Sequence, residues 1–173
     1  MATPDTIVLR RHRDLEGRRY QQWVRRGLLA ALAALLIAGL VNVFGQRPTT
    51  ATAATDAATL SVYAPAHVRG GLLYMARFRI SAHRELADAV LVLDQGWFEG
   101  LQVNTIEPSP IGEASRNGKV ALDLGHIPAG EHYTLFMQFQ VDPTNIGRRA
   151  QNVELDDGDT TILRVRRTLT IFP

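Results

Sequence analysis

The sequence predicts an all-β fold, an antiparallel β-sandwich of about seven or eight strands, preceded by a single transmembrane α-helix. Two observations carry this prediction. Residues 27–45 form an apolar run without one charged side chain, whereas from Leu60 onward apolar and polar residues alternate. About 20 apolar residues are enough for a helix to cross a bilayer, and a period of two is typical of half-buried strands.

The apolar run reads GLLAALAALLIAGLVNVFG. At about 1.5 Å per residue, a helix of this length spans about 28 Å, close to the hydrocarbon thickness of about 30 Å. A secretory signal peptide is the alternative, with Ala51-Thr52-Ala53 as its cleavage site. The run is longer than a signal peptide needs, and residues 1–26 make an overlong leader. We therefore expect an uncleaved membrane anchor.

The charge balance differs on the two sides of this run. Residues 1–26 contain seven Arg and three acidic residues, whereas residues 60–173 contain eleven basic and thirteen acidic residues. Basic flanks stay on the cytoplasmic side of a membrane. The sequence thus predicts a single-pass cell-membrane protein with a cytoplasmic N-terminus and its C-terminal domain outside. Arg25, Arg26 and Trp23 are expected to contact lipid, and nucleic acid is not an expected partner because the basic excess lies in the tail.

A stripe of small residues recurs every four positions in the apolar run and ends in a polar amide. Residues four apart share one face of a helix, and small side chains allow two helices to approach closely. We expect this face to contact the transmembrane helix of another membrane protein, although an Ala-rich segment produces such spacing by chance about as readily. The residues of the stripe are Ala30, Ala34, Ala38 and Asn42.

Residues 46–59, QRPTTATAATDAAT, are rich in Thr and Ala and show no apolar period. This composition predicts a flexible linker. The expected organisation is therefore a basic cytoplasmic tail (1–26), a transmembrane helix (27–45), a linker (46–59) and an extracytoplasmic β-sandwich domain (60–173).

Strand-like segments follow one another through the predicted domain. The clearest alternation lies in 72–82 and 132–142, and Asp156-Asp157-Gly158-Asp159 has the residues of a hairpin turn within 148–172. Several short strands at this spacing favour a sandwich. The remaining expected strands are 60–65, 89–94, 101–106 and 119–125.

The stretch from about 120 to 165 resembles bacterial extracytoplasmic immunoglobulin-like modules. The similarity lies in a turn of the type hydrophobic-Pro-x-Gly-Glu, here Ile127, Pro128, Gly130 and Glu131, which precedes a long strand, a Gly-containing turn and a further strand. The resemblance implies an immunoglobulin-like sandwich and a role in adhesion, scaffolding or partner binding. It implies no catalytic residues.

Catalytic and metal-binding patterns are not evident in the sequence. The chain has no cysteine, which excludes disulfides and thiolate chemistry, and its serines and histidines lie in no recognisable catalytic or ligand spacing. The carboxylates at 156–159 suit a hairpin turn better than a calcium loop. We expect no enzymatic activity, no metal and no cofactor.

Two groups of apolar residues are candidates for partner contacts. Trp97 and Phe98 lie between glycines in GWFEG, where one of the two rings is expected to be exposed and to bind a partner, although capping of the core is the commoner role. Phe136 and Met75 are out of phase with the apolar residues of their strands. If they share a sheet with Arg77, Arg79 and Arg164, the outer face is mixed and suits a protein partner better than a lipid surface.

These observations together predict an accessory or interaction subunit of a bacterial membrane complex. The alternative is a membrane-tethered module that binds cell-wall glycan or another polymer, because an exposed Trp97 ring would stack on sugars. The fold alone does not separate the two.

Overall fold

A computed structural model describes residues 19–41 and 46–173. The chain divides into two compact units, 1–44 and 45–173. Asn42, the last residue of the predicted helix stripe, lies outside the described residues, as does most of the basic tail.

The first unit contains helix α1, Arg19–Leu40. It starts before the predicted span because residues 20–26 contain no Gly or Pro and include the good helix formers Gln and Arg, so the helix continues without a break into the apolar run. None of residues 20–40 is buried, and Leu, Ile and Val side chains are exposed along the helix. Tyr20–Leu40 is long and apolar enough to cross a membrane. An apolar surface of this kind requires an apolar environment.

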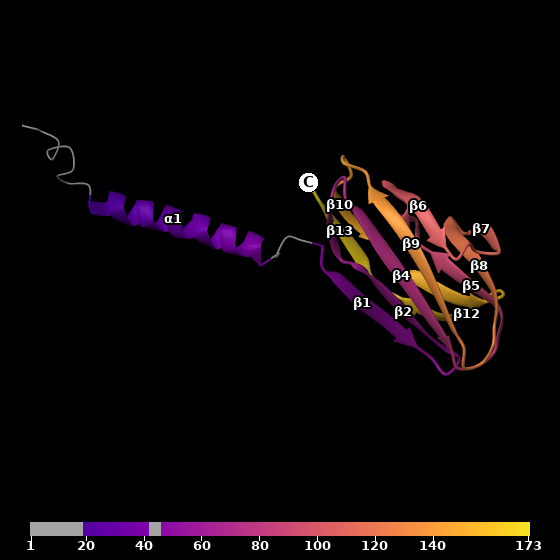
Figure 1. Ribbon diagram of the computed structural model, residues 1–173. Helices are drawn as coiled ribbons and strands as arrows, with labels where there is room; N and C mark the ends of the chain where they lie inside the picture. Colours follow the sequence, from indigo (N-terminus) through magenta and orange to yellow (C-terminus); the bar gives the residue numbers. More distant parts are fainter. Residues whose placement is uncertain (1–18, 42–45) are drawn as a thin grey trace, which may run out of the picture. The chain divides into compact units, whose positions relative to one another are not determined.

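The second unit is built from strands connected by short turns (Figure 1). A single 3-10 turn, η2, covers Gln95–Trp97. The strands of the described residues are β1 (Pro48–Ala54), β2 (Ala58–Pro65), β3 (His67–Arg69), β4 (Leu73–Ala82), β5 (Leu86–Leu93), β6 (Leu101–Glu107), β7 (Gly112–Arg116), β8 (Lys119–Ile127), β9 (His132–Val141), β10 (Gly147–Ala150), β11 (Val153–Asp157), β12 (Thr160–Val165) and β13 (Thr168–Phe172).

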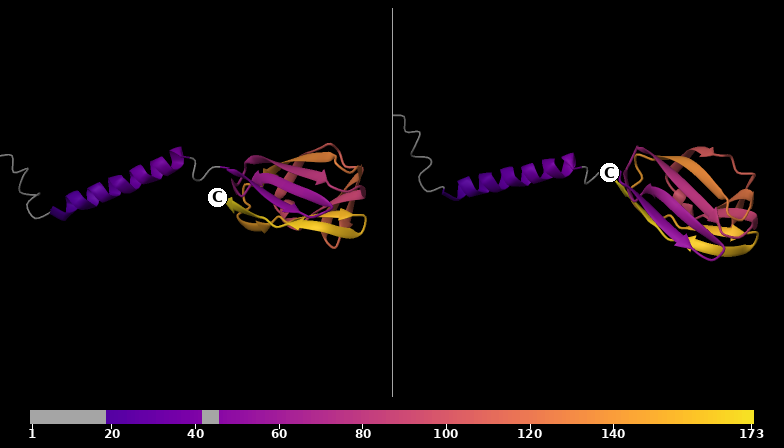
Figure 2. Two further views of the ribbon diagram at one scale, coloured as in Figure 1. Left: turned by 90° about the horizontal axis from the view of Figure 1, so that it is seen from below. Right: turned by 60° about the horizontal axis from the view of Figure 1, so that its bottom comes forward.

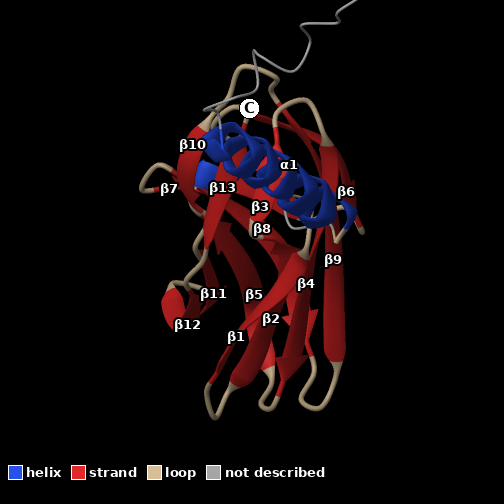
Figure 3. Ribbon diagram, turned by 90° about the vertical axis from the view of Figure 1, so that its left-hand side faces the viewer, coloured by secondary structure: helices blue, strands red, loops and turns tan. Residues whose placement is uncertain are grey.

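The strands form two five-stranded antiparallel sheets and a small third sheet. Sheet A has the order β1-β2-β4-β9-β6, sheet C has the order β12-β11-β5-β8-β7, and sheet B has the order β10-β13-β3. Sheets A and C face each other, and β12 of sheet C lies beside β1 and β2 of sheet A (Figure 2). Sheet B covers one end of the sandwich (Figure 3). The predicted antiparallel β-sandwich behind one helix is confirmed, and the described residues contain more strands than the seven or eight expected.

Alternation along the central strands of sheet A explains the core. In β4 every second side chain from Tyr74 to Ala82 is buried, and β9 places Leu135 to Val141 in the same way. These side chains meet Leu91, Leu93 and other residues of sheet C in one continuous cluster. The strongest period in the sequence therefore lies in the two strands at the centre of the fold.

The prediction of a flexible linker at 46–59 is wrong. Pro48–Ala54 form the edge strand β1, which pairs with β2 in continuous register from Pro48 opposite Pro65 to Ala54 opposite Thr59. Ala51 and Ala53 are partly buried and pack on the main core. The sandwich therefore begins at residue 48 and not at 60. Pairing with β2 outweighs the low strand propensity of Ala. The local sequence pattern of residues 46–59 does not indicate this pairing.

The hairpin predicted around Asp156-Asp157-Gly158-Asp159 is confirmed. β11 pairs with β12, and the flanking strands β10 and β13 also pair with each other. Gly158 has a positive φ of 60°, which a glycine adopts without strain. The same hairpin therefore contributes two strands to sheet C and two to sheet B.

Candidate functional site

The outward face of sheet A carries large apolar side chains that the fold leaves uncovered. Tyr63 of β2 lies opposite Arg77 of β4, and Arg77 lies opposite Phe136 of β9, so the three form one row across neighbouring strands. Met75 is two residues before Arg77 and shares its face. We call Tyr63, Met75, Arg77 and Phe136 the sheet A patch.

The apolar side chains of the sheet A patch are exposed to solvent. Tyr63 is 37%, Met75 55% and Phe136 39% exposed. The guanidinium carbon of Arg77 lies 4.9 Å from the centre of the Tyr63 ring, a cation–π contact that holds the two side chains against the sheet. Directly opposed residues on one face have Cβ atoms about 5 Å apart. The four side chains therefore form one continuous surface.

The composition of this patch is that of a protein-binding surface. Aromatic residues, Met and Arg are the types enriched at the centre of protein interfaces. The strand register puts Phe136 and Met75 in one sheet with Arg77 and Arg79, so the condition considered for a mixed face is met for these residues. The condition is not met for Arg164, because Arg164 belongs to β12 of sheet C.

Trp97 does not contact a partner from the surface. Its side chain is fully buried, with ring centres 5.1 Å from Phe78 and 5.4 Å from Phe139, and its Nε1 donates a hydrogen bond of 3.3 Å to the carbonyl oxygen of Asn152. The assignment of Trp97 as a partner-binding residue is therefore corrected to a core residue. A buried ring also offers no face on which a sugar could stack.

The 3-10 turn η2 explains why the tryptophan points inward. Gly96 is buried against β10, and a Cβ at this position would collide with the carbonyl oxygen of Ala150. Only glycine therefore allows the turn to pack close enough for Trp97 to enter the core. Phe98, the second residue of the predicted pair, stays half-buried and lines an open cleft of about 420 Å³ together with Gln102 and Gln140.

Polar groups lock the turn in place. Gln151 is fully buried and donates hydrogen bonds to the Tyr74 hydroxyl (3.1 Å) and to the carbonyl oxygen of Gly96 (3.3 Å). Burial raises the pKa of Tyr74 to about 12, partly offset by this hydrogen bond and by the charge of Arg167. Burial also lowers the pKa of Arg167 to about 10, with an opposing contribution from Tyr74. Both groups keep their ordinary protonation at neutral pH.

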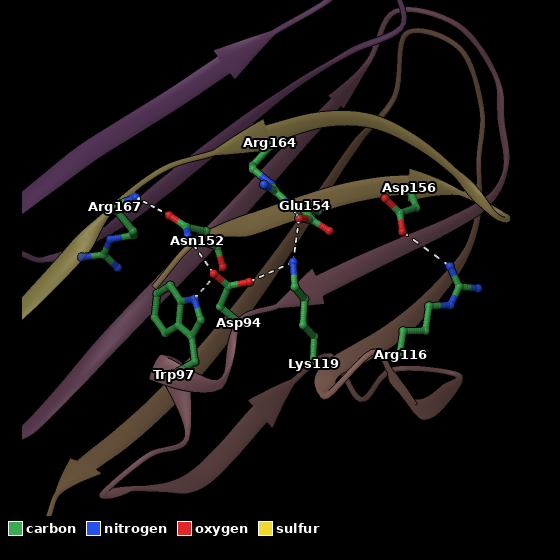
Figure 4. Close-up of polar contacts among 9 residues, drawn as sticks. All are labelled: Asp94, Trp97, Arg116, Lys119, Asn152, Glu154, Asp156, Arg164 and Arg167. Carbon is green, nitrogen blue, oxygen red and sulfur yellow. Dashed lines mark hydrogen bonds and ion pairs between the residues drawn. The ribbon is translucent and has the colours of Figure 1, made fainter. Parts of the chain in front are cut away.

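A second cluster of polar residues lies on sheet C and consists of paired charges (Figure 4). Lys119 of β8 lies 3.1 Å from the Asp94 carboxylate and donates a hydrogen bond of 2.7 Å to Glu154, which also pairs with Arg164. We call Asp94, Lys119, Glu154 and Arg164 the sheet C ion cluster. Sequence reasoning missed it, because its members lie on segments up to 70 residues apart and no local pattern joins them.

The carboxylates considered for a cation at 156–159 are held by protein groups. Asp156 lies 3.4 Å from the Arg116 guanidinium, which also approaches Asp159, and Asp157 accepts a hydrogen bond of 2.8 Å from the backbone of Asp88. These contacts support the interpretation of residues 156–159 as a hairpin turn and not as a calcium loop. Within residues 19–41 and 46–173, no group of three or more His, Asp or Glu side chains is arranged to hold a metal ion.

Known proteins resemble this chain in structure but not in sequence. No protein-family model and no curated protein matches the chain. CaCohA2 from Clostridium acetobutylicum is 15% identical over 65% of this chain and 88% of its own, with a TM-score of 0.45. A non-cellulosomal cohesin from the hyperthermophilic archaeon Archaeoglobus fulgidus is 15% identical over 62% and 86%, with a TM-score of 0.39.

A CARDB domain from Pyrococcus furiosus, in complex with di-metal ions, is 14% identical over 69% of this chain and 97% of its own, with a TM-score of 0.38. The strand pairings and the continuous core, and not these likenesses, establish the architecture. The chain has the fold of an immunoglobulin-like antiparallel β-sandwich, preceded by an apolar helix.

Proposed function

We propose that this protein is a single-pass, membrane-anchored interaction subunit that binds another membrane protein through the sheet A patch and through helix α1. The observation that carries the proposal is the row of Tyr63, Arg77 and Phe136, flanked by Met75, on a sheet face that nothing else in the described sandwich covers. Exposed apolar residues that are contiguous, and not scattered singly, mark interaction sites.

The role of α1 as an anchor is supported by strand β1. Cleavage after the Ala51-Thr52-Ala53 site would remove most of β1 and separate Ala51 and Ala53 from the core on which they pack. It would also leave β2 as an unpaired edge, which invites aggregation. An uncleaved helix avoids both costs. The arginines of the tail then place the N-terminus in the cytoplasm and the sandwich outside.

The patch is tested by truncating its side chains without lowering strand propensity. We expect Phe136→Thr combined with Met75→Thr to reduce recovery of the partner at least about tenfold, because central aromatic and Met contacts dominate binding energy. The measurement is a mild-detergent pull-down of the tagged full-length protein from its native membrane, quantified by mass spectrometry against wild type.

Ile111→Thr is the matched control, because Ile111 is 74% exposed but lies outside sheet A. It should leave partner recovery unchanged. Equal recovery with the double variant, in a protein whose melting temperature is unchanged, would contradict the proposed role of the patch.

Helix α1 is tested separately on its small-residue face. Ala30, Ala34 and Ala38 lie along one side of the described helix. We expect Ala34→Leu to weaken the association with the partner, because a large side chain holds the two helices apart. Asn42→Leu should do the same if the amide donates across the interface. Ala33→Leu, on another face, is the control, and retention of the partner by both test variants would exclude this face as the contact.

A further inference from the structure

One end of the sandwich combines exposed apolar side chains with basic ones. It is the end at which β1 begins and β13 ends, visible in Figure 1 by the label of the C-terminus. We call it the entry end. Its residues of interest are Arg69, Leu72, Leu73, Ile146, Arg148 and Phe172.

Backbone contacts join the segments of the entry end into one surface. The Gly70 amide donates a hydrogen bond of 2.9 Å to the carbonyl oxygen of Phe172, and the Gly71 amide donates one of 3.0 Å to that of Val141. A Cβ at Gly70 would lie only 2.7 Å from the carbonyl oxygen of Pro143, so the turn after β3 packs directly on the loop after β9. The entry end is therefore a defined surface and not a set of separate loops.

The apolar side chains of this end are uncovered. Leu72 is 43%, Leu73 50%, Ile146 53% and Phe172 42% exposed. The four turns at the opposite end, at 55–57, 83–85, 128–131 and 158–159, contain none of the exposed large apolar side chains of the described sandwich. Ile111, in the loop between β6 and β7, is the one exposed large apolar side chain of the described sandwich that lies neither at the entry end nor on sheet A. The exposed apolar residues of the turns are therefore concentrated at the entry end.

Charge accompanies the apolar residues. Arg69 and Arg148 are both exposed, and Arg69 lies opposite Phe172 in the pairing of β3 with β13. Asp142 and Glu99 are exposed carboxylates of the neighbouring loops, and Glu99 lies 3.6 Å from the guanidinium of Arg149. Arginine next to Leu, Ile and Phe is the combination by which proteins rest on an anionic membrane surface, with apolar groups at the acyl boundary and guanidinium groups among the headgroups.

The short connection between α1 and β1 favours a membrane surface as the partner of the entry end. Seven residues, 41–47, separate the last residue of α1 from the first residue of β1, and a fully extended connection of this length reaches about 25–30 Å. If α1 spans a bilayer, as the proposed function requires, the start of β1 stays within this reach of the membrane surface. We infer that the entry end rests on the lipid surface and contacts anionic headgroups through Arg69 and Arg148.

The absence of cysteine from the chain allows a direct test. The full-length protein carries one fluorophore, at Ile146→Cys on the entry end or at Ala129→Cys in the β8–β9 turn at the opposite end. Phe172→Cys is a second entry-end position, for the case that labelling at 146 perturbs the loop. Each protein is reconstituted in vesicles of phosphatidylglycerol and phosphatidylethanolamine that contain a headgroup-attached quencher.

We expect the label at 146 or 172 to be quenched at least about three times as strongly as the label at 129. Arg69→Glu with Arg148→Glu should remove about half of this difference, and so should replacing the vesicle lipid by phosphatidylcholine, because the attraction to anionic lipid is electrostatic. Equal quenching at both ends would overturn the inference. The inference would also be overturned if neither the charge reversal nor the change of lipid altered the quenching at 146 or 172. The connection to α1 alone would then hold the label near the membrane surface.

Two further outcomes distinguish the lipid contact from a protein contact at the entry end and from the membrane anchor itself. Shielding of the 146 label that occurs in native membranes but not in these vesicles would assign the entry end to a protein and overturn the lipid contact. Resistance of the vesicle-bound protein to alkaline extraction reports on the anchor itself. A protein that is extracted contradicts the proposed function, whereas one that resists extraction but shows equal quenching contradicts the lipid contact alone.

Discussion

Replacing Trp97 with alanine is expected to lower the free energy of unfolding of the sandwich by about 3–5 kcal/mol, the usual cost of truncating a buried tryptophan. The ring is fully buried, lies in tilted contact with Phe78 and Phe139, and has the Arg167 guanidinium 4.9 Å from its centre. The cavity would lie under η2, where buried Gln151 also depends on the turn for its hydrogen bond to Gly96. Native domains are stable by only about 5–15 kcal/mol, so this loss approaches the threshold for folding.

The measurement is urea unfolding of the full-length protein in mild detergent, followed by the far-ultraviolet circular dichroism of the strands. Trp97→Phe is the matched control, because it keeps an aromatic ring against Phe78 and Phe139 but removes the hydrogen bond to Asn152. Its expected cost is about 1–2 kcal/mol. It should also keep partner binding, which separates a core role from a surface role. A loss below about 1 kcal/mol for Trp97→Ala would contradict the core assignment.

Replacing Lys119 with methionine is expected to cost about 2–3 kcal/mol. Removing one partner of a buried ion pair usually costs about 3–5 kcal/mol, because a buried charge is left unpaired. The effect is smaller here because the Lys119 side chain is 26% exposed and Arg164 still pairs with Glu154. Glu154 itself is only 10% exposed at its side chain, so it cannot recover much hydration. Met keeps the aliphatic packing of the Lys stem.

A double-mutant cycle with Glu154→Gln isolates the contact between the two residues. We expect a coupling free energy of about 1–2 kcal/mol that changes little between low and high salt, because partly buried charges are weakly screened. Arg166→Met, at an exposed residue directly after β12, should change the free energy of unfolding by less than about 0.5 kcal/mol. Additive effects of the two substitutions would show that the contact between Lys119 and Glu154 contributes no specific pairing energy.

The first prediction concerns the core between the sheets and the second concerns the charged residues of sheet C, so the two have different physical origins. Loss of Trp97 leaves a cavity and removes packing contacts in the core. Loss of Lys119 leaves the buried Glu154 carboxylate without one of its positively charged partners. Both residues lie away from the sheet A patch, which sits on the outer face of the other sheet. Their variants should therefore affect partner binding only by unfolding the domain, and only the patch variants should reduce binding in a fully folded protein.

The fold class followed from local physics. The alternation in 132–142 and 72–82 requires one face of each strand to be buried, and the Asp-Gly turn at 157–158 requires a tight reversal. The sequence therefore predicts both strands and the hairpin. The helix followed from composition, because a run of 19 residues without a charged side chain is long and apolar enough for a helix that could cross a bilayer. The out-of-phase residues Phe136 and Met75 marked the outer face for the same reason, since a residue that breaks the period must point away from the core.

Tertiary structure decided what depends on distant neighbours. A Thr/Ala segment became strand β1 because β2 supplies the hydrogen bonds and the core supplies a surface for Ala51 and Ala53. Trp97 turned inward because Gly96 allows a close approach to β10, a contact between residues more than 50 positions apart. The partners of Lys119 come from two other segments. The sequence by itself determined the periods, the turns and the charge asymmetry, because these arise within a few residues. Only the folded chain decided which side chains are buried, paired or left for a partner, because these depend on which strands lie side by side.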